Sequence, residues 1–226
     1  RFPGIQYTLG NENGSNCGGN KITFERALNV SCNVAFGSIA GKLGQTKLAE
    51  QAAKFGFGTD PLVGLAGNPS RFTASDAKLE APQLAQTGIG QFEVAATPLQ
   101  MAMVAAGIAN DGSVMTPYIV KTVRSPNLHV LDQADPHQLS QAMSASNAAK
   151  LQQMMVSTAQ VGTATSGRIA GVDVGAKTGT AQSTKDRPPY AWFVSYAKAG
   201  SKQVAVAVLV ESSDTARDEI AGVGLA

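Results

Sequence analysis

Apolar residues recur at helical spacing in the middle of the chain, between residues that typically begin and end helices. Thr97 is a helix-capping residue type, and Pro98 stands at what would be the first helical position. The pair Asp111-Gly112 supplies a stop signal. This pattern predicts a helix over residues 97–110. Its buried stripe follows the i, i+3, i+4, i+7 spacing and consists of Leu99, Ala102, Met103 and Ala106.

The other helical patterns are shorter or richer in glycine. Thr23 is the expected cap of a helix that runs to Val30. A second helix is expected to follow Ser31 and to end near Leu43, because Gly44 comes next. The apolar positions that suit the buried face of this second helix are Val34, Ile39 and Leu43. The remaining predicted helices cover residues 46–55 and 147–158.

The last third of the chain changes to strand patterns. Apolar residues alternate before Lys177, and the runs 190–196 and 203–211 indicate an antiparallel hairpin around Gly200. The continuous apolar run Val204–Val210 predicts a strand that is covered on both faces. Elsewhere we expect a long loop over 58–82, a strand over 118–123, an exposed hairpin over 124–142 and a helix that begins near 215. Helices followed by antiparallel strands favour an α+β fold, a central antiparallel sheet covered by helices.

The composition allows one domain with a substantial core. Hydrophobic residues are 43% and charged residues 15% of the 226, which excludes a disordered tail. The formal charge of +2 is too small to indicate a nucleic-acid partner. No spacing of histidines and cysteines predicts a metal site or a cofactor. The sequence shows no membrane-spanning stretch and no signal peptide, and residues 1–4 resemble the inside of a longer protein.

Residues 177–180 form one chemical device within a predicted strand. Lys177 supplies positive charge beside a developing oxyanion or a substrate carboxylate, which the hydroxyls of Thr178 and Thr180 could bind. Gly179 has no side chain, so a ligand could lie against the backbone there. A surface strand with an ordinary Lys-Thr-Gly turn is the alternative interpretation, because motifs this short recur by chance.

A second candidate element, Ser31-Cys32-Asn33, lies upstream of Lys177. The Ser31 hydroxyl could pass a proton, and the Asn33 amide could hold a substrate carbonyl together with a lysine. Alone this Ser-x-Asn motif is weak, since an asparagine at such a position often only caps a helix. It gains weight because Ser-x-Asn and Lys-Thr-Gly occur in this order in penicillin-recognising serine enzymes.

A longer stretch indicates the family. In residues 87–120 an Ile-Gly-Gln turn leads to a Thr-Pro-Leu-Gln-Met-Ala helix, and residues 162–164, 177–182 and 191–194 continue the pattern. Nearly the whole chain resembles the transpeptidase domain of class B penicillin-binding proteins, and within that class the short actinobacterial penicillin-binding protein A type. The resemblance implies the fold shared by penicillin-binding transpeptidases and serine β-lactamases. Phe92 departs from the pattern, because glycine is frequent at this position in the family.

The family's nucleophile lies in a Ser-x-x-Lys motif well before Ser-x-Asn. None of the 30 residues before Ser31 forms that motif. We therefore expect residues 1–226 to be the C-terminal portion of a transpeptidase domain whose nucleophile segment lies upstream. Two accidental Ser-x-x-Lys spacings begin at Ser75 and Ser195, but both come after Ser31, and we reject them as nucleophiles.

The resemblance implies a D,D-transpeptidase that cross-links peptidoglycan stem peptides ending in D-Ala-D-Ala through a serine acyl-enzyme and is inhibited by β-lactam antibiotics. The residues carried over as catalytic are Ser31, a proton relay, Asn33, which holds the peptide carbonyl, and Lys177, which supports the electrostatics. The residues carried over as substrate-binding are Thr178, Gly179 and Thr180, with the Thr180 N–H completing the oxyanion hole.

Other functions and the cellular context follow from the same resemblance. A D,D-carboxypeptidase, a β-lactamase-like hydrolase and a non-catalytic penicillin-sensing domain are the alternatives. The hydrolase is disfavoured because the Glu-x-x-Leu-Asn run at Glu25 precedes Ser31, the reverse of the order in class A β-lactamases. The family implies the extracytoplasmic face of the bacterial plasma membrane, an upstream anchor, and membrane glycosyltransferase, divisome or elongation proteins as partners.

The chain has two cysteines: Cys17 lies in the loop before Ser31-Cys32-Asn33, and Cys32 is the middle residue of that element. They would be free thiols in a reducing cytoplasm, but the compartment that the family implies favours a disulfide between them. Such a bond would contribute about 3 kcal/mol by the chain-entropy model. His129 and His137 fall in the expected exposed hairpin without a triad-like context, so we interpret them as solvated loop residues.

Overall fold

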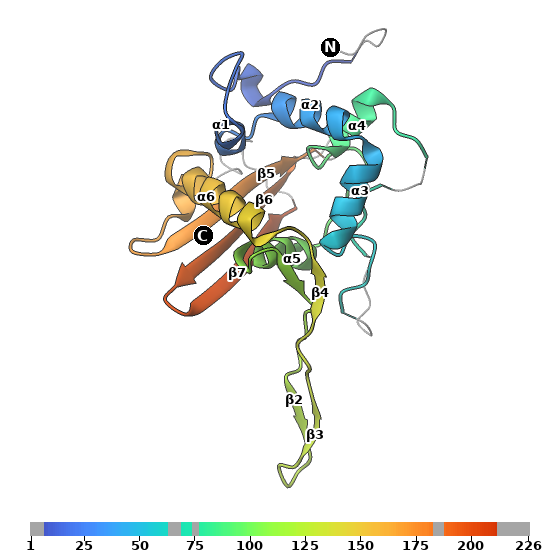
Figure 1. The fold of residues 1–226 in the computed structure, drawn as a ribbon, viewed down its shortest axis with the longest axis vertical. Helices are drawn as coiled ribbons and strands as arrows, with labels where there is room; N and C mark the ends of the chain where they lie inside the picture. The colour runs from blue at the N-terminus through green and yellow to red at the C-terminus, as the bar shows by residue number, and fades with distance from the viewer. Residues whose placement is uncertain (1–6, 63–68, 74–76, 183–187, 212–226) are drawn as a thin grey trace.

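The computed structural model describes residues 7–62, 69–73, 77–182 and 188–211 (Figure 1). After a short 3-10 helix, η1 (Glu12–Gly14), come α1 (Phe24–Asn29), α2 (Asn33–Leu43), α3 (Gln45–Lys54), α4 (Ala81–Thr87) and α5 (Pro98–Ala109). The next elements are β1 (Ser113–Met115), β2 (Thr122–Arg124), β3 (Val130–Gln133), β4 (Gln138–Gln141), α6 (Ala145–Val161) and η2 (Thr165–Gly167). The described chain ends with β5 (Asp173–Ala181), β6 (Tyr190–Ala199) and β7 (Lys202–Val210).

The last three strands form an antiparallel sheet in the order β5-β6-β7. Its register places Lys177 opposite Val194 and Gly179 opposite Trp192. The predicted hairpin around Gly200 is confirmed, with Ala199 paired to Lys202. Within the described residues β5 has a strand neighbour on one side only, so its other backbone edge is free to meet side chains or a ligand.

Tyr196 lies at the centre of the core between the sheet and helices α5 and α6. It packs with Ile108 of α5 and Met155 of α6, and its hydroxyl donates to the backbone oxygen of Gln152 at 3.1 Å. Burial raises the pKa of Tyr196 to about 12. The ring lies against Gly175, where any side chain would clash with it. These contacts fix β5 and β6 against the two helices.

The opposite face of the sheet has a core of its own. Phe193 is three residues from Tyr196, so its side chain points to the other face. It packs with Val174 and Ala176 of β5 and with two alanines at the end of α6 and just beyond it, Ala159 and Ala164. The chain after α6 therefore wraps around the edge of the sheet before it enters β5.

The prediction that β7 is covered on both faces is wrong for the described residues. Val204 and Val206 remain 60% and 46% exposed, whereas Ala205, which points to the other face, packs into the Tyr196 core. Helix α5 packs against β7, and Val208, farther along on the Val204 face, packs against the Phe193 core. The apolar run therefore marks an edge strand whose first half is covered on one face.

Helix ends follow the capping residues that the sequence shows. The Thr23 hydroxyl accepts a hydrogen bond from the N–H of Arg26 at the start of α1, and Thr97 accepts one from Gln100 at the start of α5, both at 3.1 Å. Gly44 follows the last residue of α2, as predicted. Helices α3 and α6 are also confirmed, although α6 begins earlier and ends later than the pattern suggested.

The buried face of α2 is not the predicted apolar one. Val34 and Leu43 are exposed, and the positions that are buried are Gly37 and Ala40. Helix α4, which no pattern predicted, packs against this face of α2. Ala40 lies so close to Gly88, the residue after α4, that a side chain at Gly88 would clash with it. Small residues allow the two helices to approach closely. The face of α2 that meets α4 is therefore the buried one, although its side chains are smaller than Val34 and Leu43.

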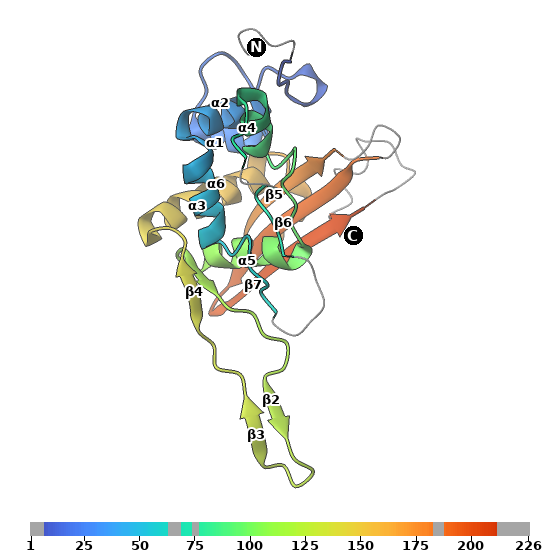
Figure 2. The same cartoon turned by 90° about the vertical axis from the view of Figure 1, so that its right-hand side faces the viewer.

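The segment between α5 and α6 forms a projecting hairpin (Figures 1 and 2). Strand β1 pairs with β4 near the body, and β2 pairs with β3 farther out. This confirms the exposed hairpin, but the predicted strand over 118–123 is wrong for most of its length. Tyr118, Ile119 and Val120 have side chains typical of strands but no strand partner, and strand pairing begins only at Thr122.

The α+β prediction is confirmed as an antiparallel sheet with helices packed on it. Predictions that fall on residues 63–68, 74–76, 183–187 and 212–226, including the helix near 215, lie outside the described residues. Among the described residues, no helix has the length and apolar character needed to cross a membrane.

Candidate active site

Ser31 sits at the end of α1 in a backbone conformation that usually belongs to glycine. Its φ is +53°, in the left-handed region. The N–H of Ser31 bonds to the carbonyl of Leu28 at 3.1 Å, and that of Cys32 bonds to the carbonyl of Ala27 at 2.9 Å. Together these bonds make a Schellman motif with Ser31 at its left-handed position. A serine that is kept where glycine fits better marks a backbone under strain, and such strain is frequent at functional sites.

The N-terminus of α2 is capped by a residue from a distant loop. Cys32, the residue before the helix, makes no side-chain cap, and the Asn11 side-chain oxygen accepts from the N–H of Val34 at 3.0 Å instead. The predicted disulfide is present: Cys17 and Cys32 are bonded, with 5.8 Å between their Cα atoms. The Asn33 amide donates to the backbone oxygen of Gly10 at 3.4 Å. Residues 10–17 are thus attached to the Ser31 element at three points.

Lys177 and Ser31 meet across the two halves of the chain. The Lys177 Nζ donates to the Ser31 Oγ at 2.8 Å and to the backbone oxygen of Thr178 at 2.6 Å. The Lys-Thr-Gly-Thr strand and the Ser-x-Asn turn therefore converge.

The environment of Lys177 disfavours its charge. Burial of the ammonium lowers the pKa of Lys177 to about 8, and the carboxylate of Glu12 acts in the opposite direction. Glu12 belongs to the loop that the disulfide holds in place. A lysine with a pKa near neutrality can change its protonation state during a reaction, which a fully solvated lysine does not readily do.

Buried Asn29 joins the Ser31 element to the end of α6. Its amide donates to the Ser157 hydroxyl at 2.9 Å, and its side-chain oxygen accepts from the Thr158 hydroxyl at 2.8 Å. Its backbone oxygen accepts from the N–H of Thr163 at 2.9 Å. The hydroxyl of Thr163 in turn meets that of Thr178 at 2.7 Å. We call these five residues the Asn29 junction; it fixes α1, α6 and β5 relative to one another.

The free edge of β5 is held at its far end by Gln91. The Gln91 amide nitrogen donates to the backbone oxygen of Thr180 at 3.1 Å, and its amide oxygen accepts from the N–H of Gln182 at 3.2 Å. Gln91 lies in the turn after α4, between Gly90 at φ +75° and Phe92 at φ +64°. The left-handed backbone at Phe92 explains why glycine suits this position, and the turn forms with phenylalanine nonetheless.

These elements border a groove of about 880 Å³. Its lining includes every residue that the sequence predicted to be catalytic or substrate-binding: Ser31, Asn33, Lys177, Thr178, Gly179 and Thr180. Gly179 borders the groove, and a methyl group added there would lie 3.2 Å from the Trp192 Cβ, a crowded distance. The glycine thus leaves room at the groove floor and avoids pressure on the neighbouring strand.

Several residues at the groove were not found by sequence reasoning. Asn11, Glu12, Gln91 and Thr163 all line it. The signals that could have pointed to the last two are the Ile-Gly-Gln and Gly-Thr-Ala runs, which were used only to recognise the family. Asn29 was noticed only within an accidental Glu-x-x-Leu-Asn match, and its role is structural, at 5% exposure.

The rejected candidates lie away from this chemistry. Ser195 and Lys198 are three residues apart on β6, so their side chains point to opposite faces of the sheet. Ser75 lies outside the described residues. His129 and His137 are exposed residues of the projecting hairpin segment. Among the described residues no group of histidine, cysteine and acidic side chains is arranged to hold a metal ion.

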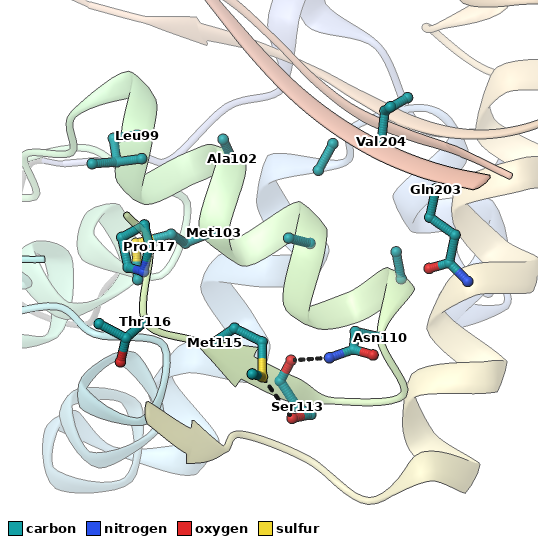
Figure 3. Close-up of a pocket in the computed structure, with 13 residues that line it drawn as sticks. Leu99, Ala102, Met103, Asn110, Ser113, Met115, Thr116, Pro117, Gln203 and Val204 are labelled. Atoms are coloured by element: carbon teal, nitrogen blue, oxygen red, sulfur yellow. Dashed lines mark hydrogen bonds between the residues drawn. The ribbon is translucent and has the colours of Figure 1, made fainter. Parts of the chain in front are cut away.

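A second groove, of about 440 Å³, lies between α5, β1 and the start of β7 (Figure 3). Leu99, Ala102 and Met103 line its helical side, and Gln203 and Val204 line its strand side. None of its lining residues is titratable, so it offers no group for acid–base chemistry. The candidate active site is therefore the larger groove.

The fold is an antiparallel sheet covered by helices, and the free edge of the sheet presents Lys-Thr-Gly-Thr to a strained Ser-x-Asn turn. This arrangement defines the class of penicillin-recognising serine acyltransferases. The chain belongs to the family described as the penicillin-binding protein transpeptidase domain, whose model matches residues 3–223.

Two curated mycobacterial proteins show the similarity in sequence. The chain is 40% identical over 216 residues to the peptidoglycan D,D-transpeptidase PbpA of Mycolicibacterium smegmatis and 35% identical over 219 residues to the protein of the same name from Mycobacterium tuberculosis. In each case 93% of this chain is covered but only 43% of the relative. The chain thus spans less than half the length of these relatives.

Solved structures show the same relationship. The ceftriaxone acyl-enzyme complex of penicillin-binding protein A from M. tuberculosis aligns with a TM-score of 0.88 at 34% identity, covering 99% of this chain and 51% of that one. The penicillin G acyl-enzyme complex of that protein aligns with a TM-score of 0.82 at 35% identity, covering 92% of this chain and 47% of that one. The fold predicted from the family resemblance is therefore confirmed.

Proposed function

We propose that this groove is the substrate site of a D,D-transpeptidase, and that the chain is the C-terminal portion of the transpeptidase domain. The observation that carries the proposal is the contact of 2.8 Å between the Lys177 Nζ and the Ser31 Oγ, within a groove bordered by the edge of β5 that has no strand neighbour among the described residues. The curated relatives that the chain matches are D,D-transpeptidases by name, and solved relatives carry β-lactams as acyl-enzymes.

The nucleophile would be a serine of an upstream Ser-x-x-Lys segment. The lysine of that segment takes the proton of the serine hydroxyl, the serine oxygen attacks the carbonyl carbon of the penultimate D-Ala, and the peptide bond to the terminal D-Ala breaks. Ser31 passes a proton to the departing D-Ala amine. An amine of a neighbouring strand then attacks the acyl-enzyme, which forms the cross-link and returns the serine hydroxyl. A β-lactam acylates the same serine but keeps its leaving amine tethered.

The groove residues divide this work by position. Lys177 holds the Ser31 hydroxyl and attracts the substrate carboxylate, which the hydroxyls of Thr178 and Thr180 also bind. The N–H of Thr180 stabilises the oxyanion. Asn33 releases its long bond to Gly10 and takes the peptide carbonyl. The peptide itself lies along the free edge of β5 as an added strand.

The cellular setting follows from the same proposal. Peptidoglycan strands are cross-linked outside the cytoplasm, so the domain would act on the extracytoplasmic face of the plasma membrane, held there by an anchor outside residues 1–226. The disulfide between Cys17 and Cys32 agrees with an oxidising compartment. A membrane glycosyltransferase with its divisome or elongation proteins would supply the glycan strands that are cross-linked.

Labelled penicillin tests the proposal on the full-length protein that carries this chain. We expect one covalent label per molecule, lost when the serine of the upstream Ser-x-x-Lys is replaced by alanine. With a donor pentapeptide and a D-amino acid acceptor, a transpeptidase forms the exchanged peptide in addition to releasing D-Ala. Release of D-Ala without exchange would identify a carboxypeptidase, and labelling without turnover of any peptide would identify a penicillin sensor.

A further inference from the structure

The edge of β5 that faces the groove has its hydrogen-bonding groups at alternate residues. In an antiparallel strand the N–H and C=O of one residue point to the same side, and those of the next residue point to the opposite side. Because the oxygen of Thr180 and the N–H of Gln182 both reach Gln91, the even-numbered residues face the groove. The Lys177 Nζ meets the oxygen of Thr178 on this same edge, which agrees with that assignment.

Gln91 takes two adjacent groups of this edge with one side-chain amide. Its N–H donates to the oxygen of Thr180 and its oxygen accepts from Gln182, the pair of bonds that a residue of an added strand would make. Ala181 lies between the two bonds and is the last residue of β5. The amide therefore supports the edge where the strand ends.

The turn that carries Gln91 is itself held firmly. The N–H of Gln91 bonds to the oxygen of Gln86 in α4 at 3.0 Å, and Gly90 adopts a left-handed φ of +75° that a larger residue would strain. Helix α4 packs closely on α2, which begins at Asn33. A chain of contacts thus runs from the Ser-x-Asn element through α2 and α4 to the backbone of Thr180.

We propose that Gln91 is a positioning residue that fixes the backbone around Thr180, so that the Thr180 N–H points into the groove at the place of the developing oxyanion. This inference rests on the proposed function, because it assigns the N–H of Thr180 to the oxyanion. Gln91 itself does not contact the reacting atoms. It acts through the peptide planes on either side of Ala181, and its loss leaves the end of an edge strand held from one side only.

Loss of the Gln91 amide should affect the acylation step more than the initial binding of penicillin. Removing one oxyanion donor lowers the rate by about 10²–10³-fold, and displacing the donor lowers the rate by a smaller factor. We expect Gln91→Leu to lower the acylation rate constant by about 10-fold, while the dissociation constant of the initial penicillin complex changes less than 2-fold. Gln91→Glu keeps an acceptor for Gln182 but places a carboxylate oxygen against the oxygen of Thr180, so it should be at least as impaired.

The test measures labelled-penicillin acylation by stopped flow over a range of concentrations, which separates binding from the acylation step. It uses the full-length protein, Gln91→Leu, Gln91→Glu and the control Gln153→Leu, which removes an exposed amide from α6. Thermal unfolding is measured in parallel. The expected result is a reduced acylation rate per active molecule in both Gln91 variants and no change in the control.

Two outcomes overturn the inference without touching the proposed function. One is a parent-like acylation rate in Gln91→Leu. The other is a lower melting temperature and a smaller active fraction with an unchanged rate per active molecule, which would make Gln91 a stabilising residue only. Failure of the parent protein to be acylated would instead refute the proposed function, and with it the role of Gln91.

Discussion

The Asn29 junction and the projecting β2–β3 hairpin use polar and apolar residues in opposite ways. The junction buries the Asn29 amide and the Thr158 hydroxyl and joins three elements through short side-chain hydrogen bonds. The hairpin instead exposes large apolar side chains, with Leu128 and Leu131 at 71% and 67%. Buried polar groups that are fully bonded specify one arrangement, whereas a solvated two-stranded hairpin specifies little beyond itself. The elements beside Ser31 and Lys177 are therefore held in one arrangement, whereas the hairpin is not.

The largest effect should come from Lys177, at the site that the junction supports. Lys177→Met removes the charge beside Ser31 and is expected to lower the rate of penicillin acylation by about 10²–10³-fold. In the parent protein, acylation at low penicillin concentration should fall as the pH rises through about 8, because the lysine loses the charge that attracts the substrate carboxylate. An acylation rate that increases across this range would mean that the neutral lysine is the active form.

The same lysine makes a separate prediction about stability. Its pKa in the folded state lies below 10.5, so its charge disfavours folding below about pH 8, and this penalty fades as the pH rises toward 10.5. Lys177→Met should therefore be as stable as the parent at pH 7 or more so, although it is inactive. Chemical denaturation at pH 7 compares the two proteins, and a marked loss of stability would show that the bond to Ser31 matters more than the charge.

The junction should respond next. Asn29→Leu keeps the side-chain size but removes the partner of the Ser157 hydroxyl and leaves the Thr158 hydroxyl with only the Met154 oxygen, and we expect a loss of about 2–3 kcal/mol in the free energy of unfolding. The exposed Asn147 of α6 supplies a matched control, Asn147→Leu, with little expected change. Equal effects of the two substitutions would contradict the role given to the junction.

A smaller gain is expected at Ser31. Ser31→Gly relieves the left-handed backbone and should raise the free energy of unfolding by about 1 kcal/mol while acylation is lost. Ser31→Ala removes the same hydroxyl without relieving the backbone, so it should lose acylation with no gain in stability. If both variants have the parent melting temperature, the backbone at Ser31 is not strained.

The projecting hairpin should respond least. Leu131→Ser is expected to change the free energy of unfolding by no more than about 0.5 kcal/mol, because the side chain is mostly solvated. The core counterpart is Ile108→Ser, for which we expect a loss of several kcal/mol. A large effect of Leu131→Ser would show that the hairpin packs against something in solution.

The sequence was informative where its signals are local. Helix α5 carries its own cap and stop, and the residues at 31–33 and 177–180 could be recognised as motifs. The face of α2 could not be predicted, because which side is buried depends on α4, a distant and unpredicted partner. Asn11, Gln91 and Thr163 share this property: each acts through a hydrogen bond to a residue far away in the chain, and no periodic pattern records such a bond.

The turn after α4 carries a consequence for anyone who engineers this domain. Phe92 keeps a left-handed φ of +64° with an aromatic ring that is 43% exposed, so the ring gives little packing in return for the backbone strain. Glycine at this position would relieve the backbone strain and remove an exposed apolar side chain. The adjacent Gln91 bonds to β5 from this turn. Penicillin acylation measured in the more stable glycine variant would therefore show whether Gln91 still positions β5 when the turn is more flexible.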